Sequence, residues 1–263
     1  MRHIRLVVEY DGTGLHGWQR QANGPTVQQH LEEVLATLVQ HEVRVSGASR
    51  TDAGVHARGP VALFHTERTS PPNELRRGGN SLLPDQIAIR DAAEVDDAFH
   101  PRHSATGKHY RYTILQRADR SPRFRDRAWH HADPLDLAAM VAAAKLLTGE
   151  HDFSAFRSAG CAAKTTVRRV ESITITPADH GSTGFGDLLH IDIRGNAFLR
   201  QMVRIMVGTI ADCGVGELLP AQVAEILASK DRRNAGRTAP PQGLELVEVR
   251  YDGGRGKPRP ADV

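Results

Sequence analysis

Apolar and polar residues alternate in several short stretches of the chain, a period typical of half-buried β-strands. In the first part of the chain this alternation predicts four strands, over about residues 4–10, 43–47, 60–66 and 86–89. Apolar residues at helical spacing predict a helix over about 26–40, where Thr26 and Gln29 fit a capping box. A serine and two prolines open a second helix near 71–82. The predicted order is therefore β-α-β-β-α-β.

The same order returns in the rest of the chain. Strands are predicted over about residues 110–114, 167–176, 187–194 and 244–249. A helix capped by Asp133 is expected to have Pro134 at its first position and to end before Gly149. Two further helices are predicted over about 197–212 and 221–229. The chain therefore contains two copies of one β-α-β-β-α-β unit, with one extra helix.

This order predicts an α+β fold of two ferredoxin-like halves. We expect mostly antiparallel strands with the helices on one face, and a cleft between the halves as the natural place for a site. The expected boundaries are 1–105 for the first half and 106–251 for the second. Residues 252–263 are rich in glycine, proline and charge, which predicts a flexible tail.

Composition excludes several classes of protein. The apolar fraction of 40% and charged fraction of 25% are those of an ordinary globular chain. Two cysteines rule out a disulfide framework and a Cys-rich zinc site, and they fit a reducing compartment. No run of about 18 apolar residues exists, so we expect no membrane span. The first residues lead directly into a strand pattern, so we expect no signal peptide.

The net charge of +3 says less than its distribution. Between residues 102 and 127, eight basic residues are opposed only by Asp119 and Asp126. A local excess of arginine suits a phosphate backbone. The alternative is a solvated basic loop, and charge alone does not separate the two.

Two loops of the first half concentrate unusual residues. Residues 10–21 hold three glycines within six positions, which predicts a tight loop whose backbone is accessible, with Trp18 as a core anchor. Residues 49–57 hold a cation, a hydroxyl, a carboxylate and an imidazole. Asp52 is there a candidate nucleophile or base, or else the carboxylate of an Asx-turn. A metal site from Asp52 and His56 lacks a clear third ligand.

Two segments of the second half also contain candidate functional residues. Lys108, Tyr110 and Tyr112 share one face of a strand, and such a mixture suits stacking on an unpaired base together with phosphate contact. The alternative places the tyrosines in the core, more so for Tyr112. In the predicted helix 197–212, Arg200 and Arg204 are four residues apart and are expected to share a face.

Six motifs, in order along nearly the whole chain, resemble the tRNA pseudouridine synthase A family. They are Tyr-Asp-Gly-Thr with Gly-Trp-Gln, Arg-Thr-Asp-Ala-Gly-Val-His, Phe-His-x-Arg-x-Ser-Ala, Lys-x-Tyr-x-Tyr, Asp-Phe-x-x-Phe-Arg, and Asn-Ala-Phe with Met-Val-Arg. They fall at residues 10–19, 50–56, 99–105, 108–112, 152–157 and 196–204. Ser49, where many members have glycine, is a modest departure.

The resemblance implies an enzyme that isomerises uridine to pseudouridine in the anticodon arm of tRNA, at roughly positions 38 to 40. It further implies a cytoplasmic homodimer that needs no cofactor and no metal. The catalytic aspartate maps onto Asp52, the tyrosine over the base onto Tyr110, and the arginine paired with the aspartate onto Arg204. RNA-binding residues are expected at Arg50, Thr51, His56, Arg58, Lys108, Arg111, Arg157 and Arg200.

Two other functions stay open from the residues alone. One is a non-catalytic RNA-binding protein on the same frame, which would not need Asp52 together with Arg204. The other is a metal-dependent hydrolase built on Asp52, His56 and other histidines.

Overall fold

A computed structural model describes residues 1–178 and 187–251. The chain divides into two compact units. Of the described residues, one unit comprises 1–107 and 246–251, and the other comprises 108–178 and 187–245. The predicted tail, 252–263, lies outside the described residues.

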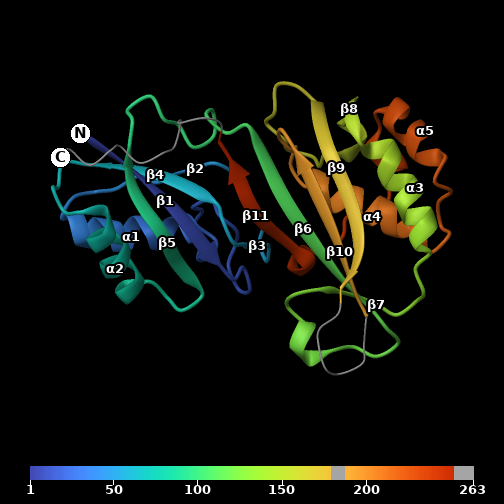
Figure 1. The fold of residues 1–263 in the computed structure, drawn as a ribbon, viewed down its shortest axis with the longest axis horizontal. Helices are drawn as coiled ribbons and strands as arrows, with labels where there is room; N and C mark the ends of the chain where they lie inside the picture. The colour runs from blue at the N-terminus through green and yellow to red at the C-terminus, as the bar shows by residue number, and fades with distance from the viewer. Residues whose placement is uncertain (179–186, 252–263) are drawn as a thin grey trace. The chain divides into compact units, whose positions relative to one another are not determined.

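The first unit has the strand order of a ferredoxin-like half. Its strands are β1 (Arg2–Tyr10), β2 (Ser46–Gly47), β3 (His56–Ala57), β4 (Val61–Thr66) and β5 (Ile87–Val95). β1 pairs antiparallel with β4 and β5, and β2 pairs antiparallel with β4. The order β2-β4-β1-β5 is the one expected of a split β-α-β motif. Figure 1 shows these strands and the two helices of the unit.

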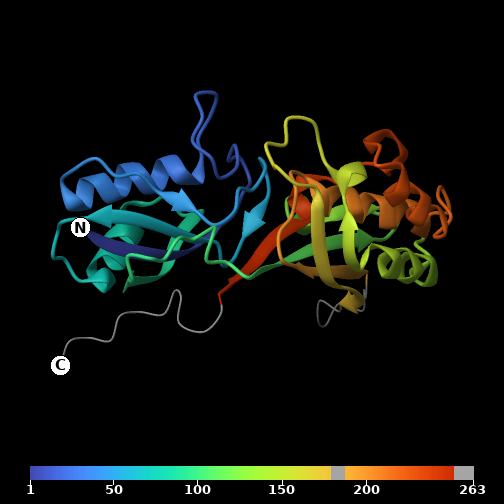
Figure 2. The same ribbon diagram turned by 90° about the horizontal axis from the view of Figure 1, so that it is seen from above.

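Helix α1 (Val27–Val39) begins where the sequence predicts it. The Thr26 side chain accepts a hydrogen bond from the Gln29 nitrogen at 3.3 Å, but the Gln29 side chain donates to Glu33, so only half of the capping box forms. Leu31 and Leu35 are fully buried, and Figure 2 shows α1 along one face of the strands. Helix α2 (Pro72–Leu82) packs against α1 and β5.

The second unit repeats this arrangement with additions. Its strands are β6 (Gly107–Gln116), β7 (Trp129–His131), β8 (Gly149–Asp152), β9 (Val167–Ala178) and β10 (Leu188–Gly195). β10 pairs antiparallel with β6 and β9, β8 pairs antiparallel with β9, and the short β7 runs parallel to β6. Helix α3 (Leu137–Leu147) packs against α4 (Met202–Gly214), α5 (Gln222–Ser229) and β9.

Short 3-10 turns complete the unit: η1 (Pro122–Phe124), η2 (Ser154–Phe156), η3 (Arg232–Asn234) and η4 (Pro241–Gly243). The last strand, β11 (Leu244–Arg250), starts in the second unit. From Leu246 onward it belongs to the first, where the Leu246 carbonyl accepts a hydrogen bond from the Arg58 nitrogen at 2.8 Å. The boundary expected from the sequence places the whole strand in the second half.

The predicted cap of α3 is wrong. Asp136, not Asp133, accepts hydrogen bonds from the nitrogens of Ala138 and Ala139, at 2.8 and 3.1 Å. The helix therefore starts three residues later than expected, and Pro134 precedes the cap. The two aspartates flank one proline and one leucine, so sequence alone offers two equally good caps.

The predicted start of α4 is also wrong. Gln201 has φ 59°, in the left-handed region, and the helix begins only at Met202. Phe198 and Arg200 therefore lie in the turn before the helix, and Arg200 does not share a helical face with Arg204. Phe198 is half-buried rather than part of an apolar helical row.

The predicted α+β class is confirmed: each unit combines mostly antiparallel strands with helices that pack together. The cleft expected between the halves stays a prediction. Within residues 1–178 and 187–251, no helix has the length and apolar character needed to cross a bilayer.

Candidate active site

Asp52 lies in the loop that joins β2 to β3. Its neighbour Thr51 is buried, while Arg50 and Ala53 on either side are exposed. The loop closes on itself through a hydrogen bond from the Val55 nitrogen to the Asp52 carbonyl at 3.2 Å. Gly54, at φ 77°, provides a left-handed conformation in this turn. The Asp52 side chain is thus carried by a tight turn beside a buried anchor.

The glycine-rich loop, residues 10–21, supports the Asp52 loop through its backbone. The nitrogen of Trp18 donates to the Thr51 carbonyl, and the nitrogen of Gly54 donates to the Leu15 carbonyl, both at 3.2 Å. A Cβ atom at Gly12 would lie 2.2 Å from the Val55 oxygen, and one at Gly17 would lie 2.5 Å from the Thr51 oxygen. Only glycine permits this approach, which explains two of the glycines.

Side chains fix the same loop from two directions. The Tyr10 hydroxyl and Thr51 Oγ1 are 2.8 Å apart and buried. His56 is 4% exposed, and its Nδ1 lies 3.0 Å from Asp11 Oδ1 and 3.1 Å from the Gly12 nitrogen. The tautomer decides which contact forms, since Nδ1 either donates to the carboxylate or accepts from the amide. Thr51 and His56, predicted as RNA-binding residues, are buried, and their side chains contact the neighbouring loop.

Tyr110 lies on β6, 6% exposed, opposite Ile193 of β10. Its ring meets the ring of Phe198 edge to face, with centroids 5.3 Å apart. Tyr112 is fully buried, and its hydroxyl donates to the Pro240 carbonyl at 2.7 Å. The interpretation of Tyr112 as a core residue is therefore confirmed.

The turn that carries Phe198 is fixed at several points. Asn196 Oδ1 accepts hydrogen bonds from the nitrogens of Ala197 and Arg169, at 2.7 and 3.0 Å, and the Asn196 nitrogen donates to the Arg169 carbonyl at 3.0 Å. At the other end the Leu199 nitrogen donates to Met202 Sδ at 3.5 Å. The turn thus ties β9 to the start of α4 and fixes the ring against Tyr110.

Arg204 lies in the first turn of α4, the one helix residue from Met202 to Gly214 that is not buried. Its Nε donates to the Ala239 carbonyl at 2.8 Å, and the Ala239 nitrogen donates back to the Arg204 carbonyl at 3.1 Å. The next residue, Pro240, accepts a hydrogen bond from the hydroxyl of the buried Tyr112. The segment that binds the Arg204 side chain is therefore itself fixed to the core.

Arg157, Arg200 and Lys108 lie near the same turn. The Ser158 nitrogen donates to the Arg200 carbonyl at 3.2 Å, and Arg200 Nη1 donates to the Ala159 carbonyl at 3.2 Å. Lys108 is half-buried and pairs in register with Gly195, the residue before the turn. These three cations, far apart in the sequence, gather within the second unit.

Arg111 does not join them. Its guanidinium forms two hydrogen bonds to Asp192, at 3.1 and 3.0 Å, and His109 Nε2 lies 2.5 Å from the same carboxylate. All three belong to the opposite face of the sheet from Tyr110, since side chains alternate along β6. Burial alone would raise the pKa of the Asp192 carboxyl, but hydrogen bonds from Arg111 and His109 outweigh it and hold that pKa below its ordinary value.

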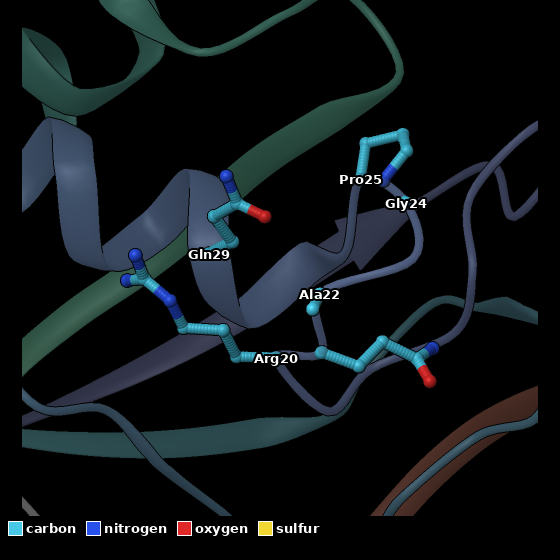
Figure 3. Close-up of a pocket in the computed structure, with 6 residues that line it drawn as sticks. Arg20, Ala22, Gly24, Pro25 and Gln29 are labelled. Atoms are coloured by element: carbon cyan, nitrogen blue, oxygen red, sulfur yellow. The ribbon is translucent and has the colours of Figure 1, made fainter.

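A hollow of about 560 Å³ lies between the glycine-rich loop and the start of α1. Figure 3 shows Arg20 and Gln29 beside it, and Asp52 does not line it. Arg20 Nη1 already binds the buried Glu32 at 2.9 Å, and the Gln21 side chain donates to the His16 carbonyl at 2.6 Å. The Arg20 and Gln21 side chains at the hollow thus make structural contacts within this region, and the hollow is not the candidate site.

No cluster of three or more His, Cys, Asp or Glu side chains suited to a metal ion occurs in the described part of the chain. Asp52 is thus a carboxylate held on a rigid turn, a form suited to act as a nucleophile or base on a bound substrate. The sequence analysis gave no supporting role to Tyr10 or Phe198, although both lie in the motifs at 10–19 and 196–204. It also missed Asp192, the partner of Arg111, which had a signal because it is a lone carboxylate between two isoleucines of a predicted strand.

Comparison with known proteins identifies the family of the chain. The sequence profile of the family described as tRNA pseudouridine synthase matches residues 6–104 and 143–252. A Geobacter sulfurreducens protein named tRNA pseudouridine synthase A is 50% identical over 251 residues, covering 95% of this chain and 100% of that protein. Proteins with the same name from Syntrophotalea carbinolica and a Thermoanaerobacter species are 50% and 45% identical over 251 residues, with 95% of this chain covered. They are covered over 97% and 100% of their own lengths. The chain belongs to the tRNA pseudouridine synthase A family.

Proposed function

We propose that the protein converts uridine to pseudouridine in the anticodon arm of tRNA, at about positions 38 to 40, with Asp52 as the catalytic residue. The observation that carries this proposal is the Asp52 turn, held by the backbone of the glycine-rich loop and by Tyr10 and Thr51. The names of the relatives supply the substrate class and the reaction.

The reaction is an isomerisation, so no atom is gained or lost. The carbon–nitrogen glycosidic bond breaks, the uracil turns, and a carbon–carbon bond to the same ribose carbon forms. A proton leaves the ring carbon and the ring nitrogen gains one. Asp52 serves as the nucleophile or the general base while the uracil is detached from the ribose. Its fixed position keeps the carboxylate within reach of the reacting atoms throughout.

Tyr110 and Arg204 are proposed to complete the site. A target base in a stem or stacked loop has to leave the stack, at a cost of a few kcal/mol. Stacking on the Tyr110 ring would hold it, and the Tyr110 hydroxyl is suited to proton transfer. Arg204 would orient the Asp52 carboxylate through two parallel hydrogen bonds and favour its charged form.

The remaining cations are proposed to bind the tRNA backbone. Arg50 and Arg58 are exposed beside the Asp52 turn, and Lys108, Arg157 and Arg200 lie around the turn that holds Phe198. Phosphate contacts of this kind would offset the cost of extruding the base. We further propose that the enzyme is a cytoplasmic homodimer whose two subunits contact one tRNA, and that it needs no cofactor or metal.

The test is incubation with an unmodified tRNA transcript, followed by mapping of pseudouridine along its sequence. The wild-type protein is expected to modify only the anticodon arm. Asp52→Asn, an isosteric change, is expected to bind the same tRNA with unchanged affinity and form no pseudouridine. Turnover by pure Asp52→Asn would refute the role of Asp52, and tRNA binding without any modification by the wild type would favour a non-catalytic RNA-binding protein.

A further inference from the structure

An apolar recess with an arginine rim lies on the second unit beside η1, where β6 and β7 end. Its volume is about 510 Å³, and its lining includes Leu115, Arg120, Phe124, Arg125, His130 and Gln242. Leu115 is buried and forms a small apolar cluster with Ala128 and Leu188, against which Phe124 packs. The recess therefore has an apolar floor with an aromatic ring at its wall.

The walls of the recess are fixed by hydrogen bonds. Arg117 donates from Nε to the Asp119 carbonyl at 2.7 Å and from Nη2 to the Arg120 carbonyl at 3.0 Å. His130 Nε2 donates to the Arg117 carbonyl at 2.8 Å, which makes Nδ1 an acceptor in the neutral ring. The Phe124 carbonyl accepts from the nitrogens of Arg127 and Ala128, both at 3.0 Å. The segment is thus a preformed turn.

The rim is strongly basic. Residues 117–127 contain five arginines and two aspartates. Arg120 and Arg125 are exposed where they line the recess, and Arg125 pairs with Asp126 at 2.9 Å. An apolar floor, an aromatic wall and a cationic rim together match an unpaired nucleotide, whose base stacks while its phosphate contacts arginine.

We propose that this recess holds one unpaired nucleotide of the bound tRNA, distinct from the uridine that reacts. The identity of the RNA rests on the proposed function. The distinction rests on β6, because Leu115 is five residues from Tyr110 and on the opposite face of the strand. At 3.3–3.4 Å per residue the two positions are about 17 Å apart along the strand. The recess thus contributes to recognition of the tRNA and not to the chemistry.

The experiment compares pocket variants with a neighbour outside the recess. Phe124→Leu keeps an apolar side chain but loses the aromatic face, and is expected to weaken binding of unmodified tRNA about tenfold without changing its salt dependence. Arg120→Gln is expected to weaken binding and to lower the salt slope by about one. Arg123→Gln is the control, because Arg123 lies in the same turn but does not line the recess. It should lower the salt slope as Arg120→Gln does, but with a smaller loss of affinity for tRNA.

Two further measurements separate this proposal from the proposed function. The single-turnover rate at saturating tRNA is expected to stay unchanged in Phe124→Leu, and photocrosslinking of tRNA substituted with 4-thiouridine should join the segment 120–130 to a nucleotide other than the modified uridine. Wild-type affinity in both Phe124→Leu and Arg120→Gln, or a crosslink to the modified uridine itself, would overturn the proposal. Neither the affinities nor the crosslink depends on catalysis by Asp52, since both can also be measured in an Asp52→Asn background.

Discussion

The rings of Tyr110 and Phe198 meet edge to face, with centroids 5.3 Å apart and planes at 86°. Such a pair contributes about 0.5–1.5 kcal/mol beyond the area it buries. Phe198 does not belong to the core of α4, because the helix begins after it. Its position in a turn fixed by Asn196 makes it a positioning residue for the tyrosine proposed to stack on the base.

The first prediction compares both members of this pair. Tyr110→Phe is expected to lower kcat about 100-fold through loss of the hydroxyl, and Tyr110→Ala to lower it further and to weaken base positioning. Phe198→Leu should lower kcat about tenfold at nearly constant KM, since it leaves the reacting groups in place but frees the Tyr110 ring. Single-turnover kinetics separate these effects. Wild-type kinetics in Tyr110→Ala would mean that Tyr110 is only a core residue.

The second prediction concerns the close backbone approach under the Asp52 turn. A Cβ at Gly12 would lie 2.2 Å from the Val55 oxygen, so Gly12→Ala is expected to displace the turn and to abolish most activity. Gly14→Ala is the matched control, because Gly14 has φ 74° but an added Cβ there would meet no atom within 4 Å. It should cost about 1 kcal/mol of stability and leave activity nearly intact. Equal activity in the two variants would contradict the proposed support.

The elements that the sequence predicts well are those whose signals are local. Helix α1 depends on Thr26 and on apolar residues at helical spacing, all within one segment, so its bounds are predicted almost to the residue. The start of α4 depends instead on Asn196 bonding to Arg169 of another strand. Gln201, at the end of the same turn, adopts a left-handed conformation, and no local pattern reveals either feature.

The candidate site divides in the same way. Asp52 stands out in the sequence because four reactive residue types crowd one short loop. Arg111 is predicted as an RNA contact because it lies in a segment where basic residues alternate with aromatic ones, which suits base stacking and phosphate contact. Its partner Asp192 lies 81 positions away, and only the register of β6 with β10 brings the two together. Long-range pairing of this kind decides which cations face a ligand.

The third prediction tests that pairing. The pKa of the Asp192 carboxyl is lower in the folded chain than in the unfolded chain. The ionised carboxylate therefore stabilises the fold fully above the ordinary carboxyl pKa, near pH 4. This contribution is lost as the pH falls through the pKa of the folded state. Asp192→Asn is expected to lower the free energy of unfolding at pH 7 by about 2 kcal/mol. Urea unfolding at several pH values should show this difference shrinking below about pH 4.

A surface pair provides the control for this measurement. Asp126→Asn removes an exposed partner of Arg125 and is expected to change the urea midpoint very little at any pH. A difference between wild type and Asp192→Asn that persists unchanged at low pH would assign the loss to packing of the side chain rather than to its charge.

The last prediction concerns Arg204. Its Nε is fixed by the Ala239 carbonyl at 2.8 Å, so the planar guanidinium has a defined orientation at the start of α4. A lysine keeps the charge but cannot make that bond together with two parallel bonds to a carboxylate. Arg204→Lys is therefore expected to slow the single-turnover rate at least tenfold, and Arg204→Gln, which also removes the charge, to slow it further. Both lose the same bond to Ala239, so thermal unfolding should show a similar small loss of stability in each. Arg200→Lys is the matched control, since Arg200 lies in the preceding turn and is exposed, and it should weaken tRNA binding without slowing the saturated rate. A wild-type rate in Arg204→Lys would show that a positive charge suffices and would contradict the proposed two-pronged bond to Asp52.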